Sequence, residues 1–305
     1  MYSYTGLNRL LETKGMKKSE LATELGISSR TIAKIGKGEK LSDKVIERLC
    51  SFFECTKEDI VTEQSDNNIL KTLREEKYAK VSGGLYHETQ VRLTYNSNRI
   101  EGSRLSEDQT RLIFETNTIG AEGGLPVDDI IETANHFHAV DYIIDCADEP
   151  LTEDIIKTLH KILKTGTKDS HISWFNVGEY KSKANVVGGQ ETTRPAMVKG
   201  EMKKLIAQYA DTKDIGIKDI IKFHHDFEMI HPFQDGNGRV GRLIAFKECL
   251  RFNLVPFIIE DGKKMFYYRG LKEWNNEPGF LIDTCLDGQD TYKRMLNYFE
   301  IEFKE

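Results

Sequence analysis

Apolar residues recur every three to four positions along most of the chain, which is the spacing of one face of an α-helix. This pattern predicts five short helices within residues 1–63. It predicts further helices over residues 69–80, 85–100, 106–114, 127–144, 152–163, 202–209, 218–229, 240–252 and 278–303. Residues 178–189 differ, because polar and apolar residues alternate there and the segment ends in two glycines, which predicts a short β-hairpin. The expected fold class is all-α, a helical bundle with one short hairpin.

A change of character between the two helical regions predicts a domain boundary. Residues 64–68 are polar, the helical pattern that follows is strongly charged, and the segment closes with Gly83 and Gly84. We therefore expect a small domain over residues 1–63, a linker or connecting helix over residues 64–84, and a second domain over residues 85–305.

Composition narrows the class of protein. Of 305 residues, 39% are hydrophobic and 30% are charged, which suits a soluble globular protein. The five cysteines are odd in number and form no C-x-x-C pair, so we expect reduced thiols and a cytoplasmic protein without a zinc site. There is no secretory signal and no apolar run of about 18 residues, so no membrane association is expected.

The first domain carries a helix-turn-helix pattern. Gly26 lies at the turn, Ser28 can cap the second helix, and Ile32 and Ile35 fall on its apolar face. The net charge is −6 for the chain but +1 for residues 1–63. The segment resembles the lambda-repressor/Cro-type DNA-binding domain. That resemblance predicts DNA as a partner, binding as a homodimer, and base-reading residues on the second helix at Ser29, Arg30, Ala33 and Lys34. The alternative is a helix-turn-helix used for protein contacts.

The densest candidate chemistry lies in residues 231–242, His-Pro-Phe-Gln-Asp-Gly-Asn-Gly-Arg-Val-Gly-Arg. His231 can be a neutral base near pH 7, and Asp235 is a carboxylate of the kind that binds Mg²⁺ together with substrate phosphates. The turn at residues 236–238 opens a helix, and backbone N–H groups at a helix N-terminus bind anions. Arg239 and Arg242 can pair with phosphate oxygens. The combination predicts a Mg-nucleotide site beside a general base.

Other interpretations of the same stretch are weaker. Residues 236–241 also fit the dinucleotide pattern G-x-G-x-x-G, and residues 254–261 look like a second strand that ends in acidic residues. That pattern requires a strand directly before it, whereas residues 220–230 show helical spacing. A helix N-terminus that is merely capped by Asp235 and Asn237 is a further alternative.

A metal-hydrolase site at His224, His225 and Asp226 is another alternative. It needs additional ligands at helix ends and leaves the Gly-Asn-Gly-Arg segment without a role. His136, His138 and His160 do not have a spacing that converges on a metal, so we interpret them as structural or surface residues.

Residues 231–242 match the Fic family motif H-x-F-x-[DE]-G-N-G-R-x-x-R at every defined position, and the resemblance covers roughly residues 85–300. Fic proteins are mostly enzymes that move AMP from ATP to a hydroxyl of a target protein. The resemblance implies a Fic-fold bundle in which His231 is the base and Asp235 holds Mg²⁺. The residues that it implies for the phosphates are Gly236, Asn237, Gly238, Arg239 and Arg242.

A second stretch, Ser97 to Gly102, resembles the Fic inhibitory motif [ST]-x-x-x-E-[GN]. Ser97 and Glu101 are four residues apart and share a helix face, and Gly102 can end the helix. The resemblance implies that Glu101 pairs with Arg242 and keeps ATP out of its reactive pose. The alternative is that Glu101 is an ordinary surface glutamate at a helix end. In some Fic relatives the corresponding glutamate assists removal of AMP from protein.

The resemblance also predicts residues around the nucleotide. The hairpin corresponds to the Fic flap, with residues 181–187 as the edge that holds the target backbone. Val187, Gly188, Gly189 and Gln190 are expected to pass the nucleotide, and Tyr267 and Asn275 to line the adenine pocket. Aromatic packing in the core is the alternative for Tyr267.

These observations together predict a self-inhibited protein adenylyltransferase that uses Mg²⁺ and ATP and acts on Ser, Thr or Tyr of a target protein. The alternatives are a transcription regulator whose Fic domain only senses nucleotide, and an enzyme that removes AMP from protein.

Overall fold

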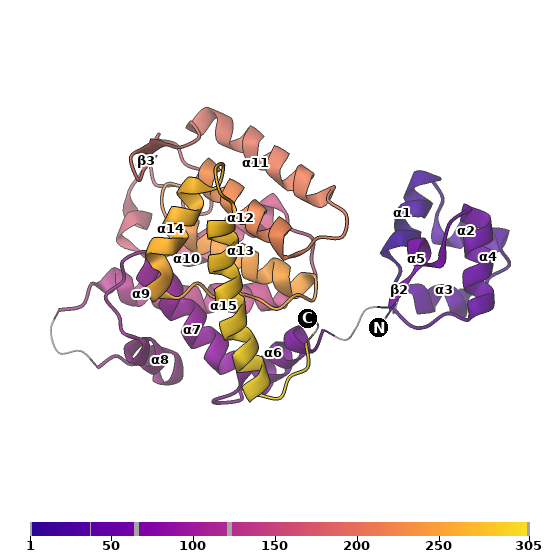
Figure 1. Cartoon of the computed structure of the whole chain (residues 1–305), viewed down its shortest axis with the longest axis horizontal. Coiled ribbons are helices and arrows are strands. Elements are labelled where there is room, and N and C mark those ends of the chain that lie inside the picture. Colours follow the sequence, from indigo (N-terminus) through magenta and orange to yellow (C-terminus); the bar gives the residue numbers. More distant parts are fainter. Residues whose placement is uncertain (1, 37, 64–66, 121–123, 304–305) are drawn as a thin grey trace. The chain divides into compact units, whose positions relative to one another are not determined.

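The computed structural model describes residues 2–36, 38–63, 67–120 and 124–303. The chain forms two compact units, Met1–Asn67 and Asn68–Glu305, each with its own hydrophobic core. Both units are built almost entirely from helices, as Figure 1 shows. The expected all-α class is therefore confirmed, together with a helix-turn-helix unit and one short hairpin.

The first unit contains the five predicted helices and one pair of very short strands. The helices are α1 (Thr5–Thr13), α2 (Lys18–Glu24), α3 (Ser29–Gly36), α4 (Asp43–Phe53) and α5 (Lys57–Ile60). Strand β1 (Tyr2–Ser3) pairs antiparallel with β2 (Thr62–Glu63), which brings the two ends of the unit together. The apolar stripes of the helices meet in one core that includes Leu7, Leu21, Ile35, Leu49 and Ile60.

The second unit is a helical bundle. Its α-helices are α6 (Asn68–Ala79), α7 (Leu85–Ile100), α8 (Glu107–Thr116), α9 (Val127–Asp145), α10 (Glu153–Lys164), α11 (Pro195–Ala210), α12 (Ile217–Ile230), α13 (Asn237–Arg251), α14 (Lys264–Glu273) and α15 (Gly279–Tyr298). Two 3₁₀ turns, η1 (Lys168–His171) and η2 (Asp261–Lys263), lie between them. Strands β3 (Val186–Val187) and β4 (Gln190–Glu191) form the hairpin.

Helix α13 is the centre of this bundle. It packs against α7, α9, α10 and α12, and thirteen of its fifteen residues are buried. Two of the buried residues are charged and adjacent, and the Lys247 ammonium bonds to Glu248 (2.8 Å) and to the Glu149 carbonyl at 2.5 Å. This pairing lets a helix with charged residues on several faces lie in a core, because a buried charge needs a partner.

The segment expected as a linker or connecting helix, residues 64–84, divides in two. Residues 64–66 lie outside the described residues, and α6 belongs to the bundle. Its Ile69, Leu70 and Leu73 are buried in the core of the second unit. Arg74 adds bonds to the last carbonyls of α9, at Ile144 and Asp145. The bundle therefore begins at α6 rather than at α7.

Two further sequence expectations concern strands and membranes. Residues 254–260, which look like a strand in the sequence, form no strand and no helix. This removes the second strand that a dinucleotide-binding unit requires, and α12 lies where its first strand would be. No helix in the described part of the chain is long and apolar enough to cross a membrane.

Buried histidines make the stability of the bundle depend on pH. Burial lowers the pKa of His160 and of His224 to about 3, of His231 to about 4, and of His136 well below its usual value. The unfolded chain therefore binds more protons than the folded one below about pH 6.5, so stability falls as pH falls. Glu228 opposes this trend, because burial raises its pKa to about 8, but one carboxyl does not offset four histidines.

We expect the free energy of unfolding of the second unit to be lower at pH 5 than at pH 7 by roughly 4 kcal/mol. Both tryptophans, Trp174 and Trp274, lie in this unit, so their fluorescence in urea reports on it alone. An equal or higher urea midpoint at pH 5 would contradict the burial of neutral histidines.

Candidate functional site

The loop from His231 to Gly236 joins the end of α12 to the start of α13. His231 caps α12 in a left-handed conformation (φ 51°), and Gly236 precedes α13 with φ 79°. The Asn237 side chain closes the loop, since its amide accepts from the Phe233 N–H (2.7 Å) and donates to the Phe233 carbonyl (2.9 Å). The loop is therefore held rigidly, and one of the two amide N–H groups of Asn237 is used within it. The second amide N–H and the backbone N–H remain for an anion.

The predicted base sits in an environment that keeps it neutral. Burial and the nearby charge of Lys181 lower the pKa of His231 to about 4. A hydrogen bond to the backbone carbonyl of Glu228 acts in the opposite direction, and it fixes one ring nitrogen as the donor. The other ring nitrogen is then an acceptor at neutral pH.

Arg242 is enclosed by the end of α7. Its Nε donates to the Ser97 hydroxyl (3.0 Å), and its Nη2 donates to the Ser97 carbonyl (2.9 Å) and to Glu101 Oε1 (2.6 Å). Burial works against the charge, but the Glu101 carboxylate raises the pKa of Arg242 above its usual value. The guanidinium is 4% exposed and lies 5.8 Å above the Tyr267 ring.

Gly238 makes this contact sterically feasible. A Cβ at residue 238 would lie 2.9 Å from Arg242 Nη1 and would overlap the Glu101 carboxylate. Gly241, one turn further along α13, likewise faces Glu228 and His224 at distances that a side chain would not allow. The two glycines therefore let the side chains of Glu101 and Glu228 approach the axis of α13.

Arg239 turns to the other side of the helix. Its Nη1 pairs with Glu132 Oε2 (2.5 Å) and its Nη2 with Asp235 Oδ2 (3.3 Å). Lys164 bonds to the same Asp235 oxygen at 2.7 Å. Burial alone would raise the pKa of Asp235, but these two cations lower it to about 2. Asp235 is therefore ionised at neutral pH, and its side chain remains half exposed.

The first N–H groups of α13 complete the anion-binding end of the helix. The backbone N–H groups of Asn237, Gly238 and Arg239 belong to the first turn, where a helix offers no internal acceptor. With His231, Asp235 and Arg242 around them, they surround a position suited to a polyphosphate.

The flap is anchored close to His231. The Lys181 backbone N–H donates to the Pro232 carbonyl (2.9 Å), and its ammonium donates to Asn185 Oδ1 (2.9 Å) and Thr192 Oγ1 (2.6 Å). Burial lowers the pKa of Lys181 to about 8. Lys181 is therefore at the buried base of the flap, and of residues 181–187 only β3 forms an edge.

The turn of the flap is exposed. Gly188 (φ 57°) and Gly189 (φ 81°) connect β3 to β4 in conformations that favour glycine. Val186 and Val187 are exposed apolar side chains. The backbone of Gln190 lies in β4, and its side chain is outside the described part of the structure.

Tyr267 and Asn275 differ sharply in exposure. Tyr267 is buried at 1% exposure, and its hydroxyl and His224 Nε2 are 2.9 Å apart. Its placement beneath Arg242 supports the guanidinium, whereas the neighbouring Tyr268 is partly exposed and donates to the Ile100 carbonyl (3.1 Å). Asn275 is exposed in the turn after α14.

The histidines of the metal-hydrolase alternative do not converge. His225 pairs with Asp226 (2.9 Å) and stacks on Trp274, whereas His224 faces Tyr267. His160 also has a structural role, because it stacks on Phe233 at 4.0 Å between ring centroids. In the described ranges of the chain, no three His, Cys, Asp or Glu side chains are grouped so as to hold a metal ion by themselves.

Sequence reasoning missed three residues near the site. Lys164 and Glu132 lie on helices where a charged residue usually faces solvent, and they carry no signal in the sequence. Glu228 lies three residues before His231, and that spacing is the only signal that could have found it. Its Oε1 is buried and has no hydrogen-bond partner among the described residues.

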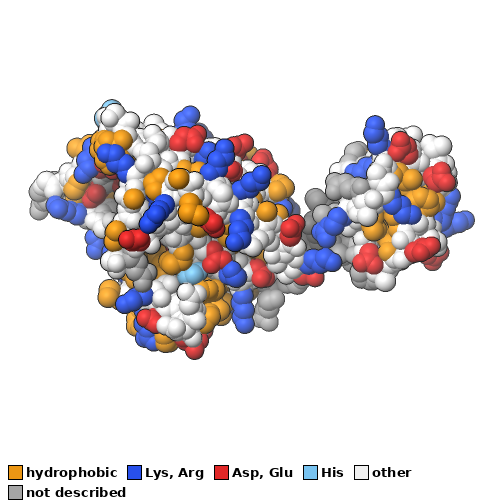
Figure 2. Space-filling view, turned by 90° about the horizontal axis from the view of Figure 1, so that it is seen from above, with side chains coloured by type: hydrophobic (Ala, Val, Ile, Leu, Met, Phe, Trp, Pro, Cys, Tyr) orange, Lys and Arg blue, Asp and Glu red, His pale blue; other side chains and the backbone are white. Residues whose placement is uncertain are grey.

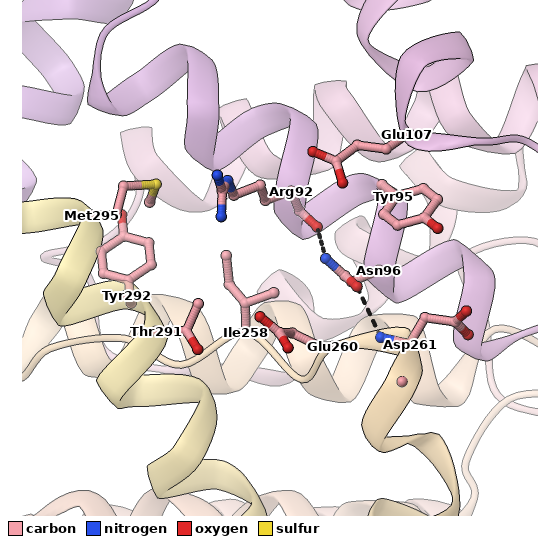
Figure 3. Close-up of a pocket in the computed structure, with 11 residues that line it drawn as sticks. Arg92, Tyr95, Asn96, Glu107, Ile258, Glu260, Asp261, Thr291, Tyr292 and Met295 are labelled. Atoms are coloured by element: carbon pink, nitrogen blue, oxygen red, sulfur yellow. Dashed lines mark hydrogen bonds between the residues drawn. The ribbon is translucent and has the colours of Figure 1, made fainter. Parts of the chain in front are cut away.

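A separate cavity of about 260 Å³ lies between α7, α15 and the segment around η2 (Figure 3). Asn96 crosses it, donating to the Arg92 carbonyl (2.9 Å) and accepting from the Asp261 N–H (2.8 Å). The other residues labelled around it are Tyr95, Glu107, Ile258, Glu260, Thr291, Tyr292 and Met295. None of the predicted site residues lines this cavity, so it is not the site built around His231.

On the first unit, α3 presents the predicted base-reading residues. Ser29, Arg30 and Ala33 are exposed and Lys34 is partly exposed. Ile35, on the opposite face, is buried in the core of the unit. The turn before α3 contains Gly26 (φ 56°), and Ser28 accepts from the Thr31 N–H (3.2 Å).

Family models match both units. Residues 150–248 match the Fic/DOC family, and residues 6–66 match the Cro/C1-type helix-turn-helix DNA-binding domain. Protein adenylyltransferase Fic of Aedes aegypti is 28% identical over 249 residues, which cover 78% of this chain and 44% of that protein. Protein adenylyltransferase Fic of Drosophila melanogaster is 29% identical over 183 residues, covering 58% and 36%. The chain thus spans less than half the length of these curated relatives.

Solved structures support the fold. A Fic domain containing signaling protein from Bacteroides thetaiotaomicron superposes with a TM-score of 0.56 at 25% identity, covering 75% of this chain and 90% of that one. Fic-1 from C. elegans superposes with a TM-score of 0.60 at 19% identity, covering 77% and 73%. The second likeness concerns the fold alone.

We expect Gly238→Ala to destabilise the second unit by about 1–3 kcal/mol, because the new methyl group overlaps the Glu101 carboxylate. Urea unfolding followed by tryptophan fluorescence measures the loss. Gly200→Ala is the matched control, since Gly200 lies on α11 with open space around it. In the Glu101→Ala background Gly238→Ala should cost less, and an unchanged cost there would show that Glu101 is not the residue displaced.

Proposed function

We propose that this chain, which contains a Fic/DOC domain and a Cro/C1-type helix-turn-helix domain, is a self-inhibited protein adenylyltransferase. It transfers AMP from Mg-ATP to a hydroxyl of a target protein. The observation that carries the proposal is the convergence of His231, Asp235 and Arg242 on the N-terminus of α13. The names of the curated relatives agree with this activity.

In the proposed reaction His231 is the general base. The target hydroxyl attacks the α-phosphorus of ATP, its proton passes to the free ring nitrogen of His231, and pyrophosphate leaves. The lowered pKa of His231 supports this role, because the imidazole is already neutral at physiological pH. The N–H groups at the start of α13 stabilise the phosphate charge that shifts during the transfer.

The residues present fit a divalent cation that arrives with the nucleotide. Mg²⁺ is usually held by one or two carboxylates together with substrate phosphates. Asp235 is ionised and half exposed, and it lies at the phosphate end of α13. When bound, the metal would neutralise phosphate charge.

The proposed inhibition follows from the bonds of Arg242. Ser97 and Glu101 occupy its Nε and Nη2, so a γ-phosphate can use this guanidinium only after Glu101 moves away. A carboxylate at this position also repels a phosphate directly. The end of α7 therefore disfavours the pose in which the α-phosphorus faces His231.

The flap supplies a place for the target. The edge of β3 carries exposed backbone and the exposed side chains of Val186 and Val187. A target segment that adds to this edge as a strand would be held by backbone bonds. Lys181 anchors the base of the flap to Pro232, one residue from His231, so such a segment would approach the base.

The transfer and its inhibition are tested together with ATP labelled at the α-phosphate. We expect Glu101→Gly to raise labelling of protein by at least roughly tenfold, because Arg242 is released. Adding His231→Ala to that variant should lower the rate by about 10²–10⁴-fold while ATP binding persists. Labelling is read from gels, and ATP binding from equilibrium dialysis.

Glu302→Gly, in an exposed segment near the C-terminal end, is the matched control and should leave labelling unchanged. Absence of label in wild type and in Glu101→Gly would reject the adenylyltransferase. Equal labelling of these two proteins would reject inhibition by Glu101 and leave the transfer itself intact.

A second role, DNA binding, is supported by the exposed face of α3. Its position after a tight turn and its match to the Cro/C1-type domain suit insertion into a major groove. In the face shown in Figure 2, the first unit mixes Lys and Arg with Asp and Glu side chains, so binding would depend on α3 rather than on bulk charge.

We expect the double variant Arg30→Ala/Lys34→Ala to enrich specific sequences from a random duplex DNA library less strongly than wild type does. The slope of the log binding constant against log salt concentration should also fall, by the equivalent of about two phosphate contacts. Lys57→Ala is the control, because Lys57 pairs with Asp43 away from α3. Sequencing of the retained duplexes measures the enrichment, and fluorescence anisotropy over a salt series measures the slope. Equal binding by the double variant and wild type would exclude α3 as the DNA-contacting helix.

A further inference from the structure

Lys164 is the last residue of α10, yet it is only 1% exposed. Its ammonium lies among three carboxylates, at 2.6 Å from Glu132 Oε1, 3.3 Å from Asp169 Oδ2 and 2.7 Å from Asp235 Oδ2. A lysine is rarely this buried unless it is paired. Its stem also packs against the loop, since a Cβ at Gly236 would lie 3.6 Å from Lys164 Cδ.

The cluster has an unusual balance of charge. Two cations, Lys164 and Arg239, face three carboxylates, Glu132, Asp169 and Asp235. Both cations contact the same oxygen of Asp235, Oδ2, and Arg239 also binds Glu132. The orientation of the Asp235 carboxylate is therefore set from one side by two fixed donors.

This arrangement has a consequence for divalent cations. A free Mg²⁺ that approaches Asp235 meets two positive charges within about 3 Å of the same carboxylate, and their repulsion offsets much of its attraction. Nucleotide phosphates bring negative charge and oxygen ligands with them. A cation that enters on those phosphates keeps its own ligands and needs only one further oxygen.

We propose that Lys164 is a positioning residue that holds Asp235 from behind and keeps free divalent cation off this carboxylate, so that metal enters only on nucleotide phosphates. This inference rests on the proposed function for the assignment of Asp235. It differs from that function because it concerns metal binding in the absence of nucleotide.

The test is a Mn²⁺ titration of the full chain without nucleotide, with free Mn²⁺ measured by electron paramagnetic resonance. We expect weak binding to wild type and a roughly tenfold or greater gain in affinity for Lys164→Ala, since the three carboxylates lose their resident cation. Adding Asp235→Asn to that variant should abolish the gain. Lys157→Ala is the matched control, because Lys157 lies on the same helix but pairs with Glu153 and Glu179.

Equal Mn²⁺ affinity of Lys164→Ala and wild type would overturn the proposal. If Lys164→Ala does not fold, Lys164→Gln replaces it. Mn²⁺ binding by wild type is a second test that needs no variant of Lys164. Tight nucleotide-free Mn²⁺ binding by wild type that is lost in Asp235→Asn would also overturn the proposal. Because no reading depends on AMP transfer, a chain that shows the expected Mn²⁺ pattern but labels no protein would refute the proposed function and support the role of Lys164.

Discussion

The buried charge of Arg242 is the constraint on which the second unit depends. A guanidinium inside a protein is costly unless it is paired. The acceptors for its Nε and Nη2 come from Ser97 and Glu101, at the end of a helix that is more than a hundred residues earlier in the chain. The contact therefore ties α7 to α13, and in the proposed function it is also the contact that ATP must replace. The bonds that stabilise the buried guanidinium are thus the same bonds that inhibit AMP transfer in the proposed function.

The two arginines of the motif are only three residues apart on α13, but they lie in different electrostatic environments. Arg242 faces α7, whereas Arg239 joins Glu132, Asp235 and Lys164 on the other side of α13. In the proposed function, Arg242 would bind phosphate once Glu101 moves away, and Arg239 would hold the carboxylate that meets the metal. Two arginines therefore have different roles, because they project from different sides of α13 and contact different residues.

Glycine has a steric role here in addition to its role in the turn. Gly236 provides the left-handed turn before α13, but Gly238 and Gly241 lie within the helix. Their missing side chains make room for Glu101 and Glu228, which approach the helix more closely than a Cβ would permit. A helix normally loses stability with each internal glycine, and here the missing side chains leave room for Glu101 beside Arg242 and for Glu228 beside Gly241.

Most helices and the grouping of residues in the loop before α13 can be predicted from the amino-acid sequence alone. Apolar periodicity located the helices, and the spacing of residues 231–242 and of Ser97 with Glu101 identified the groups that the structure brings together. These features are local, because a helix face and a capped turn follow from residues a few positions apart. The sequence predicts a hairpin over residues 178–189, whereas the strands are residues 186–187 and 190–191, so the second strand lies beyond the predicted segment.

The contacts between side chains that are distant in the sequence follow only from how the helices and loops pack. The use of the Asn237 amide inside its own loop, the burial of Tyr267 beneath Arg242 and the place of Lys181 at the base of the flap depend on which segments meet. Lys164 is the clearest example of a contact that the sequence does not predict, since a lysine at the end of an amphipathic helix usually faces water. Its role arises because α9, α10 and the loop before α13 converge, and no spacing along one helix encodes the charge that another helix will present.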